Sequence, residues 1–439
     1  GYSAAEAELA ERWPGRFFID DICLTEEWKT PEERHTNGTL DESGSFAFRI
    51  PLNDVADITD KFVVAAKYKN GTVKLIEHFK YITNPEKLAA NTDPYPVATS
   101  IKGVGGILAD GVRMGVQHAA VNIPMDRLLT MTNHGSQSII HYYKNQPYYF
   151  DKAFLATLDQ SISSYNNNNV LIYDIMLMYP NNLLDADSPN RYIKHPDGSE
   201  EANIDAVNLT DQRGVDYYGA IVSFLAERYN GDNPSCGRVV GYIVGNEITD
   251  QRVWHDMGDK SLAEFTRQYE WQLRMTNTLV KKASAAARVY VSMEHHWNTS
   301  TAEGYCGKEL LETLNEYTKA AGDYGWNVAY HSYPDDITDP RTWNDNVTDD
   351  LNTKKITFKN IQVLPQFLSQ DSMKYDGESR RVVLSEQGFD TRYAKLSEEE
   401  AEAEQAAGYA YAFYKIASTP GIDAFILHRH VDGESEGFH

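Results

Sequence analysis

Basic residues are scarce in this sequence. Lys and Arg together number 41 against 64 Asp and Glu, which gives a formal net charge of -23 over 439 residues. Binding to nucleic acid and docking on anionic membranes both need a basic surface, so this charge argues against either partner. Runs of about 18 consecutive apolar residues are also missing, and we therefore expect no segment that inserts into a membrane.

Cysteine is also scarce, with three residues in the chain. Cys23, Cys236 and Cys306 lie far apart, so they form neither a disulfide framework nor a spaced zinc motif. Apolar residues, by contrast, make up 41% of the chain and aromatic residues 12%, which is enough for a packed core. The length suits one large domain together with a small one.

The first 96 residues differ from the rest. They contain short β-rich runs such as "SGSFAFRIPL", and Asn70-Gly71 is a strong signal for a hairpin turn. A polar linker, "ANTDPYPVA", then interrupts the pattern with two prolines. We predict a small, β-rich, sandwich-like accessory domain over residues 1–96.

From residue 97 onward, apolar runs alternate with amphipathic helical segments, which is typical of a parallel α/β architecture. An insertion at 126–150 contains a hairpin-like segment, and the helix near 397 opens with a capping box formed by Ser397 and Glu400. Eight strands and seven helices predict a (β/α)8 TIM barrel over residues 97–439, with the last helix apparently missing. The predicted strands cover 99–105, 118–125, 170–180, 240–248, 288–297, 326–334, 380–388 and 422–430.

Polar residues stand at the ends of many of these apolar runs. The fourth run, "VGYIVGNEI", closes on Asn246 and Glu247, and the seventh, "RVVLSEQG", delivers Glu386. Since active sites of such barrels form at the carboxyl ends of the strands, these residues predict a polar rim around one mouth. The other candidates for this rim are His118, Tyr179, Glu294, His295, His296, Trp297, His331, Tyr333, His428, Arg429 and His430.

Two carboxylates that face each other across a closed site suit the hydrolysis of an acetal. One carboxyl group, kept protonated, donates to the departing oxygen while the other attacks the anomeric carbon. The fourth and seventh strands lie on roughly opposite sides of an eight-stranded ring. Glu247 and Glu386 can therefore flank a sugar ring.

Asn-Glu at the end of the fourth strand and Ser-Glu-x-Gly at the end of the seventh resemble clan A, the retaining β-glycoside hydrolases with (β/α)8 barrels. The resemblance covers residues 97–439 and implies that Glu247 is the acid/base and Glu386 the nucleophile. It implies that Asn246 binds the sugar 2-hydroxyl and that His331 or Tyr333 touches the nucleophile. A β-linked oligosaccharide or polysaccharide would be the substrate, without cofactor or metal. The sequence, including "YITNPE" before the barrel, also looks like a bacterial barrel family of unknown function.

Three departures from the clan leave the sugar and its linkage open. Asn122 stands where many clan members carry Arg, and the third strand ends in Met178-Tyr179 where His is common. The eighth strand ends in "ILHRHVDGE" in place of a Trp platform. We hypothesise that Arg429 and its neighbouring histidines favour an anionic or otherwise substituted sugar. Strand alternation predicts that His428 and His430 share one face and that Arg429 points the other way.

Other interpretations of the rim residues stay open. Trp254 and Trp297 could stack on sugar faces or simply pack in loops. His428 and His430 could instead bind a metal with Glu294, His295 and His331, as in a metal-dependent barrel hydrolase. A glycan-binding barrel without catalysis is a third alternative, against which the retention of both glutamates argues. No signal peptide is visible in the chain, and a secreted or periplasmic location is inferred from the resemblance alone. The sequence leaves the oligomeric state and endo or exo action undetermined.

Overall fold

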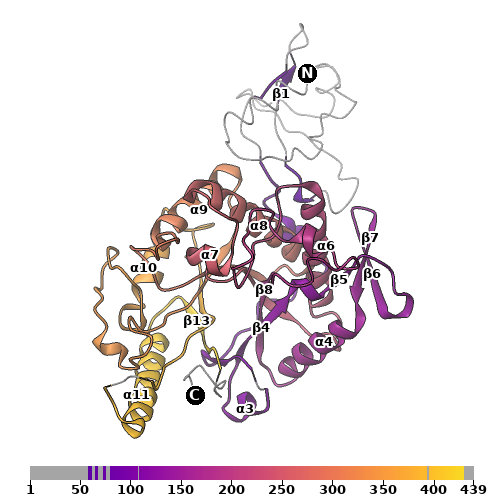
Figure 1. The fold of residues 1–439 in the computed structure, drawn as a ribbon. Helices are drawn as coiled ribbons and strands as arrows, with labels where there is room; N and C mark the ends of the chain where they lie inside the picture. Colours follow the sequence, from indigo (N-terminus) through magenta and orange to yellow (C-terminus); the bar gives the residue numbers. More distant parts are fainter. Residues whose placement is uncertain are drawn as a thin grey trace.

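Eight parallel strands close into a barrel in the computed structural model, which describes residues 58–61, 65–67, 73–75, 80–106, 108–392 and 395–429 (Figure 1). Each strand pairs with its successor in the chain, and the last pairs with the first. The predicted TIM barrel is confirmed. Its strands are β3 (Lys102–Val104), β4 (His118–Pro124), β8 (Leu171–Leu177), β9 (Val239–Val244), β10 (Arg288–Met293), β11 (Trp326–Tyr330), β12 (Val382–Leu384) and β13 (Ile422–Leu427).

A helix follows each of the first seven barrel strands, and none follows β13 among the described residues, which end at Arg429. Side chains cap several of these helices, and the predicted capping box of Ser397 and Glu400 is present. The predicted helix at 359–371 is shorter than expected. The seven helices are α3 (Leu108–Arg113), α4 (Lys152–Asn166), α6 (Gln212–Arg228), α8 (Leu262–Ala283), α9 (Gly307–Ala321), α10 (Val363–Leu368) and α11 (Glu398–Ala417).

The insertion after β4 forms a small antiparallel sheet of β5 (Leu129–Thr130), β7 (Gln146–Asp151) and β6 (Ser138–Tyr143). The predicted hairpin is the β6–β7 pair. Its turn residues Lys144 and Asn145 both have positive φ, as a two-residue hairpin turn requires. In Figure 1 the hairpin lies beside α6, and His141 Nε2 is 3.1 Å from Ser223 Oγ on that helix.

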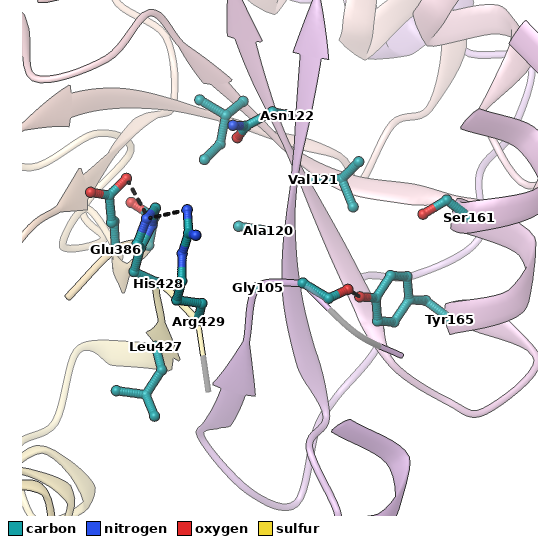
Figure 2. Close-up of a pocket in the computed structure, with 13 residues that line it drawn as sticks. Gly105, Ala120, Val121, Asn122, Ser161, Tyr165, Glu386, Leu427, His428 and Arg429 are labelled. Carbon is teal, nitrogen blue, oxygen red and sulfur yellow. Dashed lines mark hydrogen bonds and ion pairs between the residues drawn. The ribbon is translucent and has the colours of Figure 1, made fainter. Parts of the chain in front are cut away.

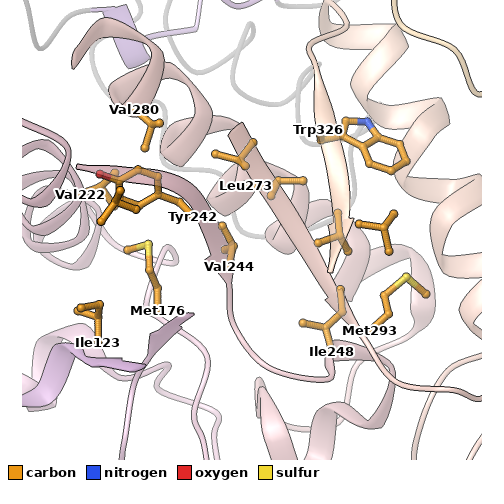
Figure 3. Packing of buried hydrophobic residues seen from close by; sticks show 14 of the residues in the cluster. Ile123, Met176, Val222, Tyr242, Val244, Ile248, Leu273, Val280, Met293 and Trp326 are labelled. Atoms are coloured by element: carbon orange, nitrogen blue, oxygen red, sulfur yellow. The ribbon is translucent and has the colours of Figure 1, made fainter. Parts of the chain in front are cut away.

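Apolar side chains pack in two layers because successive strand residues point to opposite faces. The outer layer lies between strands and helices, where Val222, Leu273 and Val280 of α6 and α8 face Tyr242 and Val244 of β9 (Figure 3). The inner layer fills the barrel itself. The barrel is therefore a packed core, and a site can form only at its ends.

Residues 80–96 pack against the amino end of the barrel. The backbone N–H of Asn91 donates to Ala283 O at 2.9 Å, and the hydroxyls of Tyr95 and Tyr173 lie 3.2 Å apart. Tyr95 thus contacts a side chain of the inner layer. This segment, which we assigned to the N-terminal part of the chain, is in contact with the barrel.

Two short strands, β1 (Ala65–Lys67) and β2 (Val73–Leu75), pair antiparallel on either side of Asn70-Gly71. Most of the predicted N-terminal domain lies outside the described residues, and its sandwich-like fold stays a prediction. No helix that the structure describes combines the length and the apolar character needed to cross a membrane.

Candidate active site

Glu247 and Glu386 come together at the carboxyl end of the barrel. Glu247 lies just beyond β9 and Glu386 just beyond β12, so parallel strands deliver both to the same mouth. One carboxylate oxygen of each and a ring nitrogen of His331 lie within 4.8 Å of one another. The structure therefore brings together three of the residues that the strand-end pattern predicted for the rim.

The backbone of Glu247 adopts the left-handed conformation, with φ 39° and ψ 51°. A residue with a Cβ rarely adopts this conformation, and outliers of this kind concentrate at functional sites. Gly245 precedes it with φ 77°, and a Cβ there would lie 2.5 Å from Nδ1 of His255. The N–H of Glu247 donates to Ser292 Oγ at 3.0 Å. The chain is thus held in a strained turn that aims this one carboxyl group.

Burial raises the pKa of Glu247 above its usual value, against the lowering effect of the hydrogen bond with His331. The carboxylates of Glu386 and Glu294 raise this pKa further, because each disfavours a second negative charge nearby. The protonated form of Glu247 is therefore favoured at higher pH than for an ordinary glutamate, as a general acid requires.

His331 links the two strand ends. Its side chain is 1% exposed, its Nδ1 lies 2.7 Å from Oε1 of Glu247, and its Nε2 lies 3.1 Å from Ser385 Oγ. Burial by itself would lower the pKa of His331, but the carboxylates of Glu386 and Glu247 outweigh burial and raise it. Both ring nitrogens have partners, so the imidazole is fixed in orientation.

Glu386 is more open than Glu247 and lines a pocket of 440 Å³ (Figure 2). The hydroxyl of Tyr333 donates to Oε1 of Glu386 at 3.0 Å, and Nδ1 of His428 lies 3.6 Å from Oε2. A carboxylate held on both oxygens beside a cavity can reach a ligand placed there. Tyr333, and not His331, is therefore the member of the strand-six pair that contacts Glu386.

A second cluster follows β10. Oε2 of Glu294 accepts from Nδ1 of His296 at 2.5 Å, and its Oε1 accepts from Thr249 at 3.0 Å. Ligand atoms of Glu294, His295 and His296 lie within 4.8 Å of one another, a spacing that could hold a metal ion. The metal set considered from the sequence is not assembled among the described residues, because His331 is grouped with Glu247 and Glu386. His430 lies outside the described residues.

Two candidates lie away from the mouth. His118 is the first residue of β4 and so stands at the amino end of the barrel, where its Nε2 lies 3.0 Å from Ser100 O. Its place in the predicted rim was wrong, because only the carboxyl ends of the strands meet at the mouth. Trp297 is 0% exposed, and its indole N–H donates to Leu351 O at 3.2 Å. The structure places Trp297 in the core and not among residues that can contact a substrate.

The remaining candidates stay near the mouth. Tyr179 and Trp254 are partly buried and pack against the inner layer of the barrel, and the Tyr179 hydroxyl interacts with Asn122. Asn246 is half-buried next to Glu247. Their contribution to binding stays a prediction.

His428 and Arg429 line the same pocket, so the predicted alternation between them was wrong. β13 ends at Leu427, and beyond a strand end successive side chains need not point to opposite faces. Nη2 of Arg429 lies 3.2 Å from Nε2 of His428.

Most residues that line the pocket were not among the candidates from the sequence, and Asn122 and Ser385 are two of these. Asn122 occupies the strand-two position where the clan often has Arg, and Ser385 directly precedes Glu386. Both positions could therefore have indicated a site residue from the sequence alone.

The fold and the mouth together define a TIM barrel with a paired-carboxylate site, in which one carboxyl group is half-buried and the other borders a pocket. Residues 94–439 match the sequence profile described as Family of unknown function (DUF5722). The chain belongs to this family. A search of curated proteins found no match.

Among solved structures, the chain is similar to Thermotoga maritima Cel5A in complex with a mannotriose substrate, with 9% identity and a TM-score of 0.42. That match covers 77% of this chain and 91% of the other. A family 1 β-glucosidase from Thermotoga maritima matches with 11% identity and a TM-score of 0.44, over 75% of this chain and 78% of the other. Similarity at this level does not bear on activity.

Proposed function

We propose that the protein is a glycoside hydrolase that cleaves a β-linked glycan with retention of configuration. The observation that carries this proposal is the approach of the Glu247 and Glu386 carboxylates, with oxygens within 4.8 Å of each other. Retaining enzymes hold their two carboxyl groups about 5–5.5 Å apart, whereas inverting enzymes need about 6.5–9.5 Å to admit a water. One oxygen of each carboxyl group within 4.8 Å of the other is compatible with the shorter spacing of double displacement.

In the first step a Glu386 oxygen attacks the anomeric carbon while the bond to the leaving oxygen breaks, and Glu247 gives its proton to that oxygen. The product is a glycosyl ester on Glu386. In the second step Glu247, now a carboxylate, takes a proton from water, and the water oxygen displaces Glu386. The net reaction adds one water across the glycosidic bond.

The surroundings of the two groups support these separate roles. Burial raises the pKa of Glu247 and so favours the proton that the first step consumes. Tyr333 donates to Oε1 of Glu386, which leaves the other oxygen on the side of His428. His331 holds the Glu247 carboxyl group through a hydrogen bond of 2.7 Å. A secreted or periplasmic location stays a prediction beside this function.

A covalent trap tests the proposal directly. A 2-deoxy-2-fluoro glycoside with a good leaving group should label Glu386, which peptide mass spectrometry identifies, and proton NMR should show the β-anomer as the first product. Glu386→Ala should lose activity by a factor on the order of 10⁴ to 10⁶, as expected for removal of a nucleophile. A matched control is Glu399→Ala on α11, a glutamate on the helix that follows β12. An inverted product, a label on another residue, or full activity in Glu386→Ala would overturn double displacement.

A further inference from the structure

A positively charged side chain, that of Arg429, lines the pocket beside Glu386. Ala120 and Asn122 of β4 lie on one side of it, and His428 and Arg429, which directly follow β13, lie on the other; Val121 is on the side of Ser161 and Tyr165 (Figure 2). Among the described residues that line it, Arg429 is the only Arg or Lys, and Glu386 is the only carboxylate. The volume of 440 Å³ falls within the range of about 300–1,000 Å³ that is usual for small-molecule sites.

Hydrogen-bond chemistry fixes how Arg429, His428 and Glu386 are connected. A guanidinium can only donate, so the contact of 3.2 Å means that Nη2 of Arg429 donates to Nε2 of His428. That nitrogen must then carry a lone pair, and the ring hydrogen lies on Nδ1. Nδ1 faces Oε2 of Glu386 at 3.6 Å. His428 is therefore oriented as a donor toward the carboxylate, and the positive charge of Arg429 is held one side chain away from it.

Three carboxylates lie near one another at the mouth. Glu247, Glu294 and Glu386 are close enough that the last two raise the pKa of the first, and the whole chain carries a net charge of -23. A negatively charged substrate would be repelled from such a mouth unless a cation lay beside it. A neutral sugar, whose hydroxyl groups amides and hydroxyls can satisfy, has no such requirement. The position of Arg429 thus distinguishes between the two classes of substrate.

We propose that this pocket binds an acidic sugar, with the carboxylate or sulfate of that sugar on Arg429 and its hydroxyl groups facing Asn122. The inference rests on the proposed function and names its substrate class. A guanidinium suits both anions because two parallel N–H groups can bind two oxygens at once. Ala120, which lies on the same face of β4 as Asn122, provides an apolar surface for the sugar ring.

Binding of monosaccharides tests the inference without relying on turnover. Isothermal titration would compare glucuronate, galacturonate and mannuronate with glucose, galactose and mannose, and with the 6-sulfates of these neutral sugars. We expect one acidic sugar to bind the wild-type protein at least about tenfold more tightly than its neutral parent, as expected for charge-assisted hydrogen bonds. Preference for a uronate would identify a carboxylate, and preference for a 6-sulfate would identify a sulfate ester.

Variants at Arg429 make the test specific. Arg429→Gln should abolish the preference, and Arg429→Lys should retain part of it, because lysine keeps the charge but not the paired donors. Arg252→Gln is the matched control, since Arg252 lies at the same end of the barrel on α7 (Gln251–Trp254) and pairs with Asp256. It removes an equal charge from outside the pocket and should leave the preference intact.

The inference would be overturned if no acidic sugar bound more tightly than its neutral parent, or if Arg429→Gln and Arg252→Gln behaved alike. Either result would leave the covalent trap on Glu386 unaffected. Conversely, a preference for acidic sugars without a trapped ester would overturn double displacement while leaving the anion site in place.

Discussion

His118 and His331 lie at opposite ends of the same barrel, and both are 1% exposed. The two nitrogens of His118 contact neutral groups, the Tyr173 hydroxyl at 3.2 Å and the Ser100 carbonyl at 3.0 Å. Burial lowers the pKa of His118 to about 4. His331 is equally buried, yet its pKa is raised because carboxylates face it. The charge of the neighbours, and not the degree of burial, separates the two histidines.

The same contrast extends to the two ends of the barrel. At the amino end the carboxylate of Asp423 is paired with both Arg288 and Arg381, at 2.8 and 3.1 Å. At the carboxyl end Glu247, Glu294 and Glu386 lie near one another, and the pocket cation is Arg429. Balanced charges stabilise a fold, whereas an excess of one sign near a cavity creates shifted pKa values of the kind that catalysis needs. The paired charges at the amino end therefore stabilise the barrel, and the carboxyl end is where the proposed chemistry would take place.

We expect the largest effect when one carboxylate at each end of the barrel is replaced and the two variants are compared in kcat/KM and in stability. Glu247→Ala should lower kcat/KM by about 10²- to 10⁴-fold on substrates with poor leaving groups, because it removes the general acid. For aryl glycosides with good leaving groups, the rate of the first step should be little affected in this variant. Asp423→Asn at the amino end should instead lower the urea midpoint and leave kcat/KM of the folded enzyme unchanged. Steady-state kinetics on both substrate types, with urea unfolding of both variants, would decide. Similar kinetic losses in the two variants would break the comparison.

An intermediate effect is expected on the pH profile of His331→Phe. The rate should fall as pH rises through the pKa of Glu247, because the acid is then deprotonated. His331 lowers that pKa through its hydrogen bond and its charge, so its loss should move the alkaline limb of kcat/KM to higher pH. The matched variant His118→Phe should leave the limb in place. An unmoved limb in His331→Phe would contradict the assignment of Glu247 as the acid.

The smallest effect, on stability alone, is expected for His118→Phe. The substitution removes the ring nitrogen that contacts the Ser100 carbonyl and leaves the Tyr173 hydroxyl with only the Tyr95 hydroxyl as a partner, which should cost about 1–3 kcal/mol in urea unfolding at pH 7. The pKa of His118 is about 4 in the folded state and 6.5 in the unfolded chain, so between these values the unfolded chain binds more protons. The wild-type protein should therefore lose stability as pH falls through this window.

The Phe variant lacks this titration, and the difference in stability between the two proteins should narrow from pH 7 to pH 4. A constant difference across that range would show that His118 does not contribute to acid sensitivity. A reduced kcat in the folded variant would show that the amino end is not merely a brace.

Much of the barrel could be predicted because its elements depend on local patterns. Apolar runs located all eight strands, and the helix expected at 307–321 coincides with α9 (Gly307–Ala321). The meeting of Glu247 and Glu386 followed from strand direction alone. The same rule placed His118 at the other end, since it begins its strand, and the sequence contained enough information to exclude it.

Other features depended on contacts between distant segments. Trp297 is enclosed by residues such as Phe367, whose ring centroid lies 4.9 Å away, and nothing near Trp297 in the chain indicates this burial. The shared orientation of His428 and Arg429 depends on where β13 ends. There the N–H of Gly105 donates to Leu427 O, and a Cβ on Gly105 would lie 2.6 Å from His428 O. The segment that directly follows β3 therefore packs closely against the backbone that leads to Arg429.

The left-handed backbone of Glu247 has a consequence for how this family would change over evolutionary time. The left-handed conformation of Glu247 destabilises a residue with a Cβ by about 1–2 kcal/mol, whereas glycine adopts it without strain and asparagine tolerates it. If selection for catalysis were relaxed, substitutions to Gly or Asn at this position would be favoured by stability and would spread. Under the proposed function, a glutamate kept there would mark an active enzyme, and a homologue with Gly at this position would keep the fold without the hydrolase activity.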